Sequence, residues 1–245
     1  MDASEYDNIA RLEARHWWYR GMAAISLILL AEGVSRTAPG LQLLDAGCGA
    51  GRMLTRLASF GKPVGIDFHP LALAHAGRVT HAPLARASVQ GLPFAPRSFD
   101  VVTSFDVLYH RAVTDDDAAL REFARVLRPG GWLLVRVPAL EQLRGAHDTV
   151  VHTRHRYSAR ELRSKLHAAG FLPRRVTYSN TLLTLPVLLR RTLQTLTGAH
   201  EATDVELPPP ALSRLLEFVL TLEAQWLAHF DLPVGVSLFA LARRP

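Results

Sequence analysis

A glycine-rich segment preceded by an acid has the residue types and spacing to hold a ligand. It reads Asp45-Ala46-Gly47-Cys48-Gly49-Ala50-Gly51 and follows the apolar run 41–44. Glycine permits tight turns and lets a ligand approach the backbone closely. A helix that begins at the end of the segment presents N–H groups without intrahelical partners. The segment therefore predicts a ligand-binding loop, although a tight strand-to-helix turn that binds nothing carries similar glycines.

A second acid stands 22 residues after Asp45, where the run 63–67 ends in Asp67. In open α/β sheets, ligands bind at the carboxyl ends of the strands. A carboxylate there can accept hydrogen bonds from two ribose hydroxyls. The Gly-x-Gly-x-Gly spacing differs from the Gly-x-Gly-x-x-Gly of dinucleotide loops. Asp45 is badly placed for a pyrophosphate but suits the ammonium of a cationic amino-acid head group.

Alternating helical and strand patterns must position these two acids. Residues 128–131, Arg-Pro-Gly-Gly, are expected to form a turn. Ser158 and Glu161 form a capping-box pattern for a helix that Gly170 ends. The alternation predicts an open, mostly parallel α/β sheet. Helices are expected over 1–35, 52–60, 70–78, 115–127, 158–169, 182–196 and 211–228, and strands over 41–45, 63–67, 84–87, 99–104, 132–137, 174–178 and 235–242.

Composition limits the class of protein. The 245 residues are 49% hydrophobic and 20% charged, which is ordinary for a globular protein. The one cysteine, Cys48, disfavours a disulfide-stapled secreted scaffold. Acids follow Met1 where a signal peptide would carry lysine or arginine, and the apolar stretch 22–31 is too short to span a bilayer. We therefore expect a cytoplasmic protein without a membrane partner.

The net charge of +6 is concentrated in residues 144–175. This window holds seven arginines and one lysine against Asp148 and Glu161, so its surplus equals that of the whole chain. Such a window could attract an anionic substrate or partner. It could equally be a solvated, arginine-rich helix face. The composition leaves both interpretations open.

Taken together, these motifs resemble those of the class I S-adenosylmethionine-dependent methyltransferases. Residues 43–51 resemble the first motif of that family, and Gly65-Ile66-Asp67 the acid of its second strand. Residues 91–102 resemble the segment leading into the fourth strand, and residues 120–134 the stretch before the fifth. The resemblance covers roughly residues 41–137. It implies a Rossmann-like, seven-stranded, mostly parallel sheet with an antiparallel final strand and helices on both faces.

The ends of the chain resemble a narrower, methyltransferase-11-like subgroup, often encoded among sugar and natural-product pathways. The cues are His-Trp-Trp-Tyr-Arg at 16–20, the histidine-containing segment 147–157 and the closing segment 232–238. On this interpretation the chain is a single methyltransferase domain. It would comprise an N-terminal helical lid at 1–36, a cofactor-binding core at 37–180, a helical cap at 181–232 and the final strand at 233–245.

The resemblance also implies how S-adenosylmethionine would be held. Asp45 and the glycine backbone would hold the methionine moiety, and Asp67 the ribose. Phe68 would lie beside the adenine. Ser88 stands where the family often has an acid for the adenine amino group, and the Val89 N–H could contribute instead. Ser104 and Phe105 would lie beside the transferred methyl group.

Residues 17–20 add candidates of their own. A helix would spread Trp17, Trp18 and Tyr19 around its circumference, so one of them would face the cofactor or substrate as a lid, or all would pin the helix to the core. Arg20 could meet the cofactor carboxylate. The full expected cofactor-binding set is Asp45, Ala46, Gly47, Cys48, Gly49, Gly51, Asp67, Phe68, Ser88, Val89, Ser104, Phe105, Tyr19 and Arg20.

Methyl transfer from a sulfonium depends mainly on in-line positioning. An oxygen or nitrogen acceptor that must lose a proton also needs a general base, for which histidine is the natural candidate. The catalytic candidates are His110, His147 and His152, with Asp148 able to orient an imidazole; each could instead serve packing or a charged loop. His147, Asp148 and His152 could also ligate a divalent metal, but no defined spacing supports one, and no metal is predicted.

The favoured interpretation is methyl transfer to oxygen or nitrogen of a small metabolite or natural product, with an anionic acceptor left open. One alternative is a protein that binds S-adenosylmethionine without catalysis. A nucleic-acid methyltransferase is disfavoured, because Ser104-Phe105-Asp106-Val107 stands where base-modifying relatives carry an Asn/Asp-Pro-Pro-aromatic motif. A nicotinamide oxidoreductase ranks last. The leucines between 182 and 189 could belong to the core or to a homodimer surface.

Overall fold

The structure is a computed structural model that describes residues 3–34, 40–144, 148, 152–184 and 208–245. Its elements follow the expected alternation of helices and strands. In chain order they are α1 (Ala3–Leu12), α2 (Trp17–Gly33), β1 (Gln42–Ala46), α3 (Arg52–Leu57), β2 (Lys62–Asp67), α4 (Pro70–Val79), β3 (Leu84–Arg86), β4 (Phe99–Phe105), α5 (Asp116–Val126), β5 (Leu127–Pro138), η1 (Glu141–Leu143), α7 (Ala159–Ala168), β6 (Leu172–Ser179), α9 (Pro210–Leu227) and β7 (Ser237–Arg243).

One sheet organises the molecule, with strand order β3-β2-β1-β4-β5-β7-β6. β1 pairs in parallel with β2 on one side and with β4 on the other. β7 runs antiparallel to both β5 and β6. The expected Rossmann-like sheet with an antiparallel final strand is therefore confirmed. The strand order reverses between β1 and β4, which is where open α/β sheets bind ligands.

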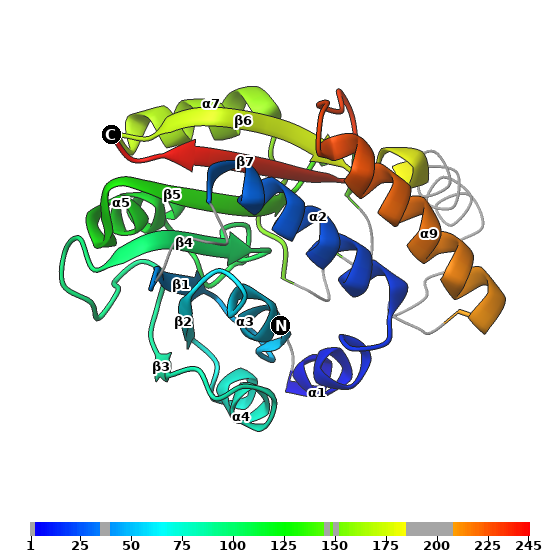
Figure 1. The fold of residues 1–245 in the computed structure, drawn as a ribbon, viewed down its shortest axis with the longest axis horizontal. Coiled ribbons are helices and arrows are strands. Elements are labelled where there is room, and N and C mark those ends of the chain that lie inside the picture. Colours follow the sequence, from blue (N-terminus) through cyan, green and yellow to red (C-terminus); the bar gives the residue numbers. More distant parts are fainter. Residues whose placement is uncertain (1–2, 35–39, 145–147, 149–151, 185–207) are drawn as a thin grey trace.

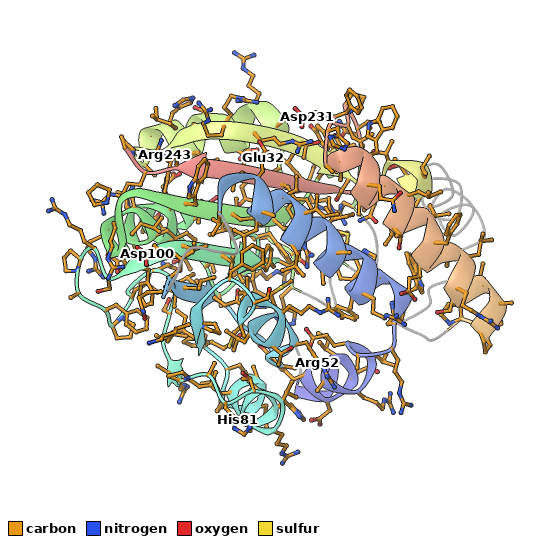
Figure 2. The ribbon with its side chains drawn as sticks, in the orientation of Figure 1. Glu32, Arg52, His81, Asp100, Asp231 and Arg243 are labelled. Carbon is orange, nitrogen blue, oxygen red and sulfur yellow. The ribbon has the colours of Figure 1, made fainter. Side chains whose placement is uncertain are left out.

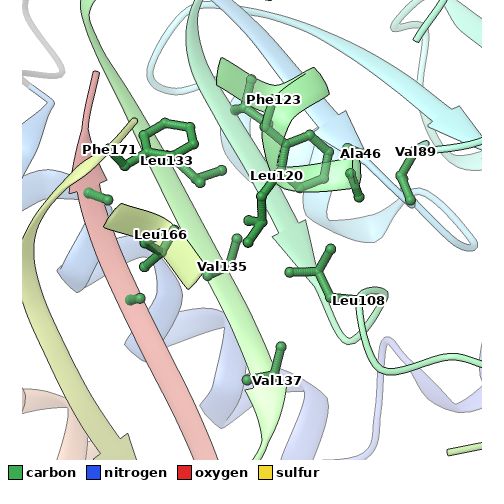
Figure 3. Packing of buried hydrophobic residues seen from close by; sticks show 14 of the residues in the cluster. Ala46, Val89, Leu108, Leu120, Phe123, Leu133, Val135, Val137, Leu166 and Phe171 are labelled. Carbon is green, nitrogen blue, oxygen red and sulfur yellow. The ribbon is translucent and has the colours of Figure 1, made fainter. Parts of the chain in front are cut away.

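Helices cover both faces of the sheet (Figure 1). On one face, α5 buries Leu120 and Phe123 against the side chains of β5, including Val135 (Figure 3). On the other face, α2 and α9 pack together over β7, with Met22 and Phe239 in the same buried cluster. Burial of both faces explains why the strands read as nearly continuous apolar runs.

Capping side chains set two helix starts where the sequence predicts them. Asp115 Oδ1 accepts a hydrogen bond from the Ala118 N–H (2.8 Å) at the start of α5. Ser158 Oγ accepts one from the Glu161 N–H (3.2 Å) at the start of α7, and Gly170 follows that helix with φ +87°. In a capping box the Glu161 carboxylate would accept from the Ser158 N–H. Here it lies 2.8 Å from His155 Nε2 instead.

The Arg-Pro-Gly-Gly segment differs from its expected role as a turn. α5 ends at Val126 and β5 begins at the next residue, so residues 128–131 already belong to the strand. The pairing of β4 with β5 shifts register there. A Cβ atom on Gly131 would lie 2.9 Å from two backbone oxygens. The glycines therefore permit a bulge in a strand that begins earlier than predicted.

The second expected C-terminal helix is α9, which matches the prediction of 211–228 within one residue at each end. The other, 182–196, lies outside the described residues beyond Thr184, so its place over the site stays a prediction. Figure 1 shows α9 lying along the outer side of α2. Within the described residues, no helix is both long and apolar enough to cross a membrane.

The contact between α2 and α9 yields a test of the fold. A Cβ atom on Gly21 of α2 would lie 2.6 Å from Leu220 Cβ of α9, whereas a Cβ on Gly77 of α4 would meet nothing closer than 3.9 Å. Gly21→Ala should lower the free energy of unfolding by about 1–3 kcal/mol through overpacking. The matched control Gly77→Ala should raise it by about 0.5–1 kcal/mol, because it removes a helical glycine. Chemical unfolding measures both, and equal stabilities would contradict this packing.

Candidate functional site

The glycine loop folds back over the end of β2. The Ile66 carbonyl accepts hydrogen bonds from the N–H groups of Gly47 (2.9 Å) and Cys48 (2.8 Å). Gly47 has φ +92°, and a Cβ atom there would lie 2.2 Å from Val107 Cγ2. Gly49 also has a positive φ, but a Cβ atom there would meet nothing within 4 Å. The loop is thus packed tightly at Gly47 and open at Gly49.

The two acids predicted from the sequence lie at the same edge of the sheet, because β1 and β2 are parallel neighbours. Asp67 Oδ2 accepts a hydrogen bond from the Gly49 N–H (3.0 Å), and its Oδ1 accepts one from the His69 N–H (2.9 Å). Asp45 is buried, and its Oδ1 accepts one from Thr103 Oγ1 of β4 (2.8 Å). Asp67 therefore holds the loop directly, and Asp45 lies beneath it.

A third carboxyl group, Glu13, joins them from the turn between α1 and α2. The Arg52 backbone N–H donates to the Glu13 carboxylate, and within the described residues Glu13 Oε2 has no hydrogen-bond partner. Figure 2 labels Arg52, the first residue of α3, on the side of that helix near α1. Glu13 was not predicted from the sequence, because it belongs to no motif and reaches the site only through the path of the N-terminal segment.

Burial raises the pKa of all three carboxyl groups. The pKa of Asp45 rises to about 7, chiefly through burial and further through Asp67, while Thr103 and Arg136 oppose the rise. Burial also raises the pKa of Glu13 to about 7, with Asp45 adding to it and Arg52 opposing it. The pKa of Asp67 is raised by burial as well. Because ionisation is costly here, a cationic ligand at this edge would stabilise the carboxylates.

The end of β2 also carries the residues expected beside an adenine. Phe68 is 59% exposed, and the Arg86 guanidinium lies 5.9 Å from its ring centroid. Tyr6 of α1 stacks on the neighbouring His69 ring at 4.1 Å, and burial together with Asp67 raises the pKa of Tyr6 to about 12. The first helix thus rests on this end of the site. Tyr6 was missed, since its contact with His69 joins segments more than 60 residues apart in the chain.

Ser88 and Val89 form a turn near β3. Ser88 Oγ accepts a hydrogen bond from the Gln90 N–H (3.2 Å), and the Val89 side chain is buried. Ser104 on β4 is fully buried, and its hydroxyl donates to the Ala46 carbonyl (2.8 Å). Phe105, the next residue, is only half-buried. Of the pair expected beside a methyl group, Phe105 is therefore the more accessible.

An ion pair that the sequence did not predict lies next to Phe105. Arg136 on β5 donates to the carboxylate of Asp106, which follows β4 with φ +58°. The Arg136 guanidinium also lies 5.2 Å from the Trp18 ring centroid, 5.4 Å from that of Phe105 and 5.8 Å from that of Phe239. A buried cation enclosed by aromatic rings and one carboxylate thus stands at the carboxyl edge of the sheet.

The aromatic residues at 17–19 attach α2 to this edge. Trp18 packs over Arg136, and the Tyr19 ring meets the Trp18 ring edge-on at 5.1 Å. Tyr19 therefore remains near the site. Arg20 instead forms an ion pair with Glu217 of α9 (2.8 Å). The expected contact between Arg20 and a cofactor carboxylate stays a prediction.

Three of the four catalytic candidates, His110, Asp148 and His152, lie within the described residues. His147 lies outside the described residues. Both oxygens of the buried Asp148 accept hydrogen bonds from the Arg156 guanidinium, at 2.9 and 3.1 Å. The carboxylate expected to orient a histidine or ligate a metal is thus engaged by an arginine. The rings of His110 and His152 stack with centroids 5.7 Å apart.

The hydrogen bonding of His110 argues against its role as a base. Its Nδ1 accepts a hydrogen bond from the Ala112 N–H (3.0 Å), so the neutral ring carries its proton on Nε2. Burial lowers the pKa of His110 to about 4. The ring therefore stays neutral at pH 7 and presents a donor. His152 is the remaining histidine candidate in the described part of the chain.

Five of the eight cations in the basic window form ion pairs, four of them with acids from outside the window. Asp116, for example, accepts from the Tyr157 hydroxyl (2.6 Å) as well as from lysine. Figure 2 labels two other such acids, Glu32 and Asp231, which both pair with Arg175. The support for an anionic partner is correspondingly weakened. The pairs are Arg144 with Glu141, Arg154 with Asp116, Arg156 with Asp148, Lys165 with Asp116 and Asp117, and Arg175 with Glu32 and Asp231.

The described residues contain one other group of side chains that could ligate a metal ion. Asp115, Asp116 and Asp117 could bring carboxylate oxygens within 4.8 Å of one another. Asp115 already caps α5, and Asp116 binds Tyr157 and Lys165. This cluster is therefore accounted for by its contacts within the fold.

Comparison with known proteins agrees with this geometry. Residues 44–135 match the family described as a methyltransferase domain. A probable S-adenosylmethionine-dependent methyltransferase from Mycobacterium tuberculosis is 32% identical over 169 residues, which are 67% of this chain and 59% of that protein. A ubiquinone/menaquinone biosynthesis C-methyltransferase from Shewanella frigidimarina is 33% identical over 129 residues, 47% of this chain and 51% of that protein. The chain thus spans between half and three fifths of these relatives.

A solved structure extends the likeness of the fold to nearly the whole chain. The protein bound to the Haloferax volcanii Trm112 methyltransferase activator superposes with a TM-score of 0.64 and 22% identity, covering 98% of both chains. Identity at this level supports the fold alone. The family assignment rests on the sequence matches above. Residues 44–135 thus belong to the methyltransferase-domain family, and over two thirds of its length the chain is similar to probable S-adenosylmethionine-dependent methyltransferases.

Proposed function

We propose that this protein transfers the methyl group of S-adenosylmethionine to an oxygen or nitrogen atom of a small molecule. The observation that carries the proposal is the convergence of Asp45 and Asp67 on a glycine loop that is open at Gly49. Buried carboxyl groups with raised pKa values favour a ligand that brings positive charge, and a sulfonium amino acid does so.

Each end of the cofactor has proposed partners. Asp45 would accept from the ammonium of the methionine moiety. Asp67 would accept from the ribose hydroxyls, since each carboxylate oxygen has a lone pair beyond its present backbone bond. Phe68 and Tyr6 would contact the adenine from two sides of the β2 end. Ser88, or the Val89 N–H, would meet the adenine amino group.

The cofactor supplies an already activated methyl group, so the protein's part is mainly orientation and the exclusion of water. Phe105 would border the methyl group, and Arg136, fixed by Asp106, would hold that side of the site rigid. Burial and Asp106 raise the pKa of Tyr109, so its hydroxyl would donate a hydrogen bond rather than accept a proton. His152 is the proposed base for a protic acceptor, with His147 as the alternative.

A second candidate is methylation at carbon. It rests on the similarity to a protein named as a C-methyltransferase, which this chain matches over about half its length. A protein that binds the cofactor without catalysis would differ from a methyltransferase only in a turnover assay, where it would methylate no acceptor. A nucleic-acid substrate loses part of its support, because four of the seven arginines in the basic window are paired within the fold.

The ribose assignment is tested at Asp67. Loss of hydrogen bonds to a charged group costs about 1.5–3 kcal/mol, so Asp67→Ala should weaken S-adenosylmethionine binding by roughly 10- to 100-fold in calorimetry. Asp231→Ala, which removes an exposed carboxylate next to Arg175, should leave the affinity unchanged. An unaltered affinity in Asp67→Ala would remove the ribose assignment.

The ammonium assignment predicts a pH dependence. With a pKa of about 7, Asp45 is ionised above that pH and protonated below it. An ammonium binds the ionised form, so affinity should be full above pH 7 and should fall by up to about tenfold per pH unit below it. Calorimetry at pH 7.5 and 6.0 measures this change. In Asp45→Asn the dependence should disappear. A dependence that persists there but vanishes in Glu13→Gln would assign it to Glu13.

The base is tested by separating turnover from binding. His152→Ala should lower kcat at least tenfold on a protic acceptor while leaving cofactor affinity unchanged. His110→Asn is the matched control, because the Asn side-chain oxygen can still accept from the Ala112 N–H. It should retain turnover. If both variants turn over at the native rate, His147 becomes the candidate.

A further inference from the structure

The outer face of α9 carries a continuous line of large apolar side chains. Spaced three or four residues apart, they are between 44% and 58% exposed. The opposite face, with Leu220 and Leu227, is buried against α2 and the sheet. We call the exposed line the α9 stripe; it consists of Leu212, Leu215, Phe218, Leu222 and Trp226 of α9 and of Phe230, which follows the helix and contacts the Trp226 ring.

The stripe is large for the surface of a monomer. About half of the surface of three aromatic and three leucine side chains amounts to on the order of 600 Å², whereas monomers rarely expose apolar patches beyond a few hundred Å². A standard protein interface buries ~800 Å² per partner. Polar residues such as Thr221 and Gln225 are exposed on the adjoining face of the helix and mark the border of the stripe. The stripe is therefore close in size to one half of a stable interface.

Two copies of the stripe placed antiparallel have side chains that complement each other. When a second α9 is laid antiparallel to the first, Leu212 faces Phe230 and Leu215 faces Trp226. Phe218 then faces Leu222. Every aromatic ring meets a leucine, and the midpoints of the three pairs fall within one residue of each other, at 220 to 221. A two-fold axis requires this self-complementarity of an interface.

From this pattern we infer that the α9 stripe is the interface of a homodimer in which two copies of α9 pack antiparallel about a two-fold axis near residue 220. Figure 1 shows α9 at the edge of the molecule, outside α2. A second copy docked there contacts neither the glycine loop nor the end of β2. The dimer thus leaves the cofactor edge of each subunit accessible.

The mass of the full chain in solution tests the dimer. Sedimentation or light scattering at about 10 µM should give twice the chain mass. Phe218→Asp/Leu222→Asp should dissociate at least 100-fold more readily, because it places charges at the centre of the interface. Thr221→Asp/Gln225→Asp, on the adjoining polar face of the same helix, should remain dimeric. A native chain that stays monomeric at 100 µM overturns the proposal. A monomer is the outcome expected if residues 185–207 or a lipid surface covered the stripe instead.

Crosslinking tests the antiparallel register. Mixing Leu215→Cys with Trp226→Cys chains should give a disulfide-linked pair, and each variant alone should give at least tenfold less. The native Cys48 is buried in the glycine loop and does not compete. Unchanged cofactor affinity in both variants verifies folding. Equal crosslinking of each variant with itself would indicate a parallel arrangement and overturn the proposed axis.

Discussion

The Ile66 carbonyl, by accepting hydrogen bonds from Gly47 and Cys48, fixes the arrangement on which the site depends. These two bonds turn the chain back across the end of β2 as it leaves β1. The turn places the Gly49 N–H against Asp67 and leaves Asp45 beneath the loop. Parallel pairing of β1 with β2 would by itself bring the two acids to one edge of the sheet. The hydrogen bonds to Ile66 add the backbone of the glycine loop between the two acids.

The rest of the edge is assembled by helices from the two ends of the chain. α1 rests on the β2 end through Tyr6, and α2 covers Arg136 with Trp18. α9 in turn fixes α2 through the close contact of Leu220 with Gly21. The same helix therefore supports the site on its inner face and offers the stripe on its outer face. Stability of the cofactor edge and association of subunits would be linked through one element.

The sequence predicted the sheet and the loop well because both follow from local patterns: apolar runs give strands, and Asp45 and Asp67 end two of them. It missed Glu13, Tyr6 and the Arg136–Asp106 pair, since these contacts join segments distant in the chain and no periodicity records them. It also read residues 128–131 as a turn, because glycine and proline mark turns and strand bulges alike. The sequence left the role of the 144–175 window open for a related reason: most of the acids that pair with its cations lie elsewhere in the sequence.

Asp106 adopts a left-handed backbone conformation that costs a residue with a Cβ atom about 1 kcal/mol, and its carboxylate compensates by pairing with Arg136. The two positions therefore depend on each other energetically. Loss of the arginine at 136 would leave the acid at 106 without this counter-charge, and glycine or asparagine at 106 would relieve the backbone. Substitutions at 106 and 136 should consequently occur together across the family.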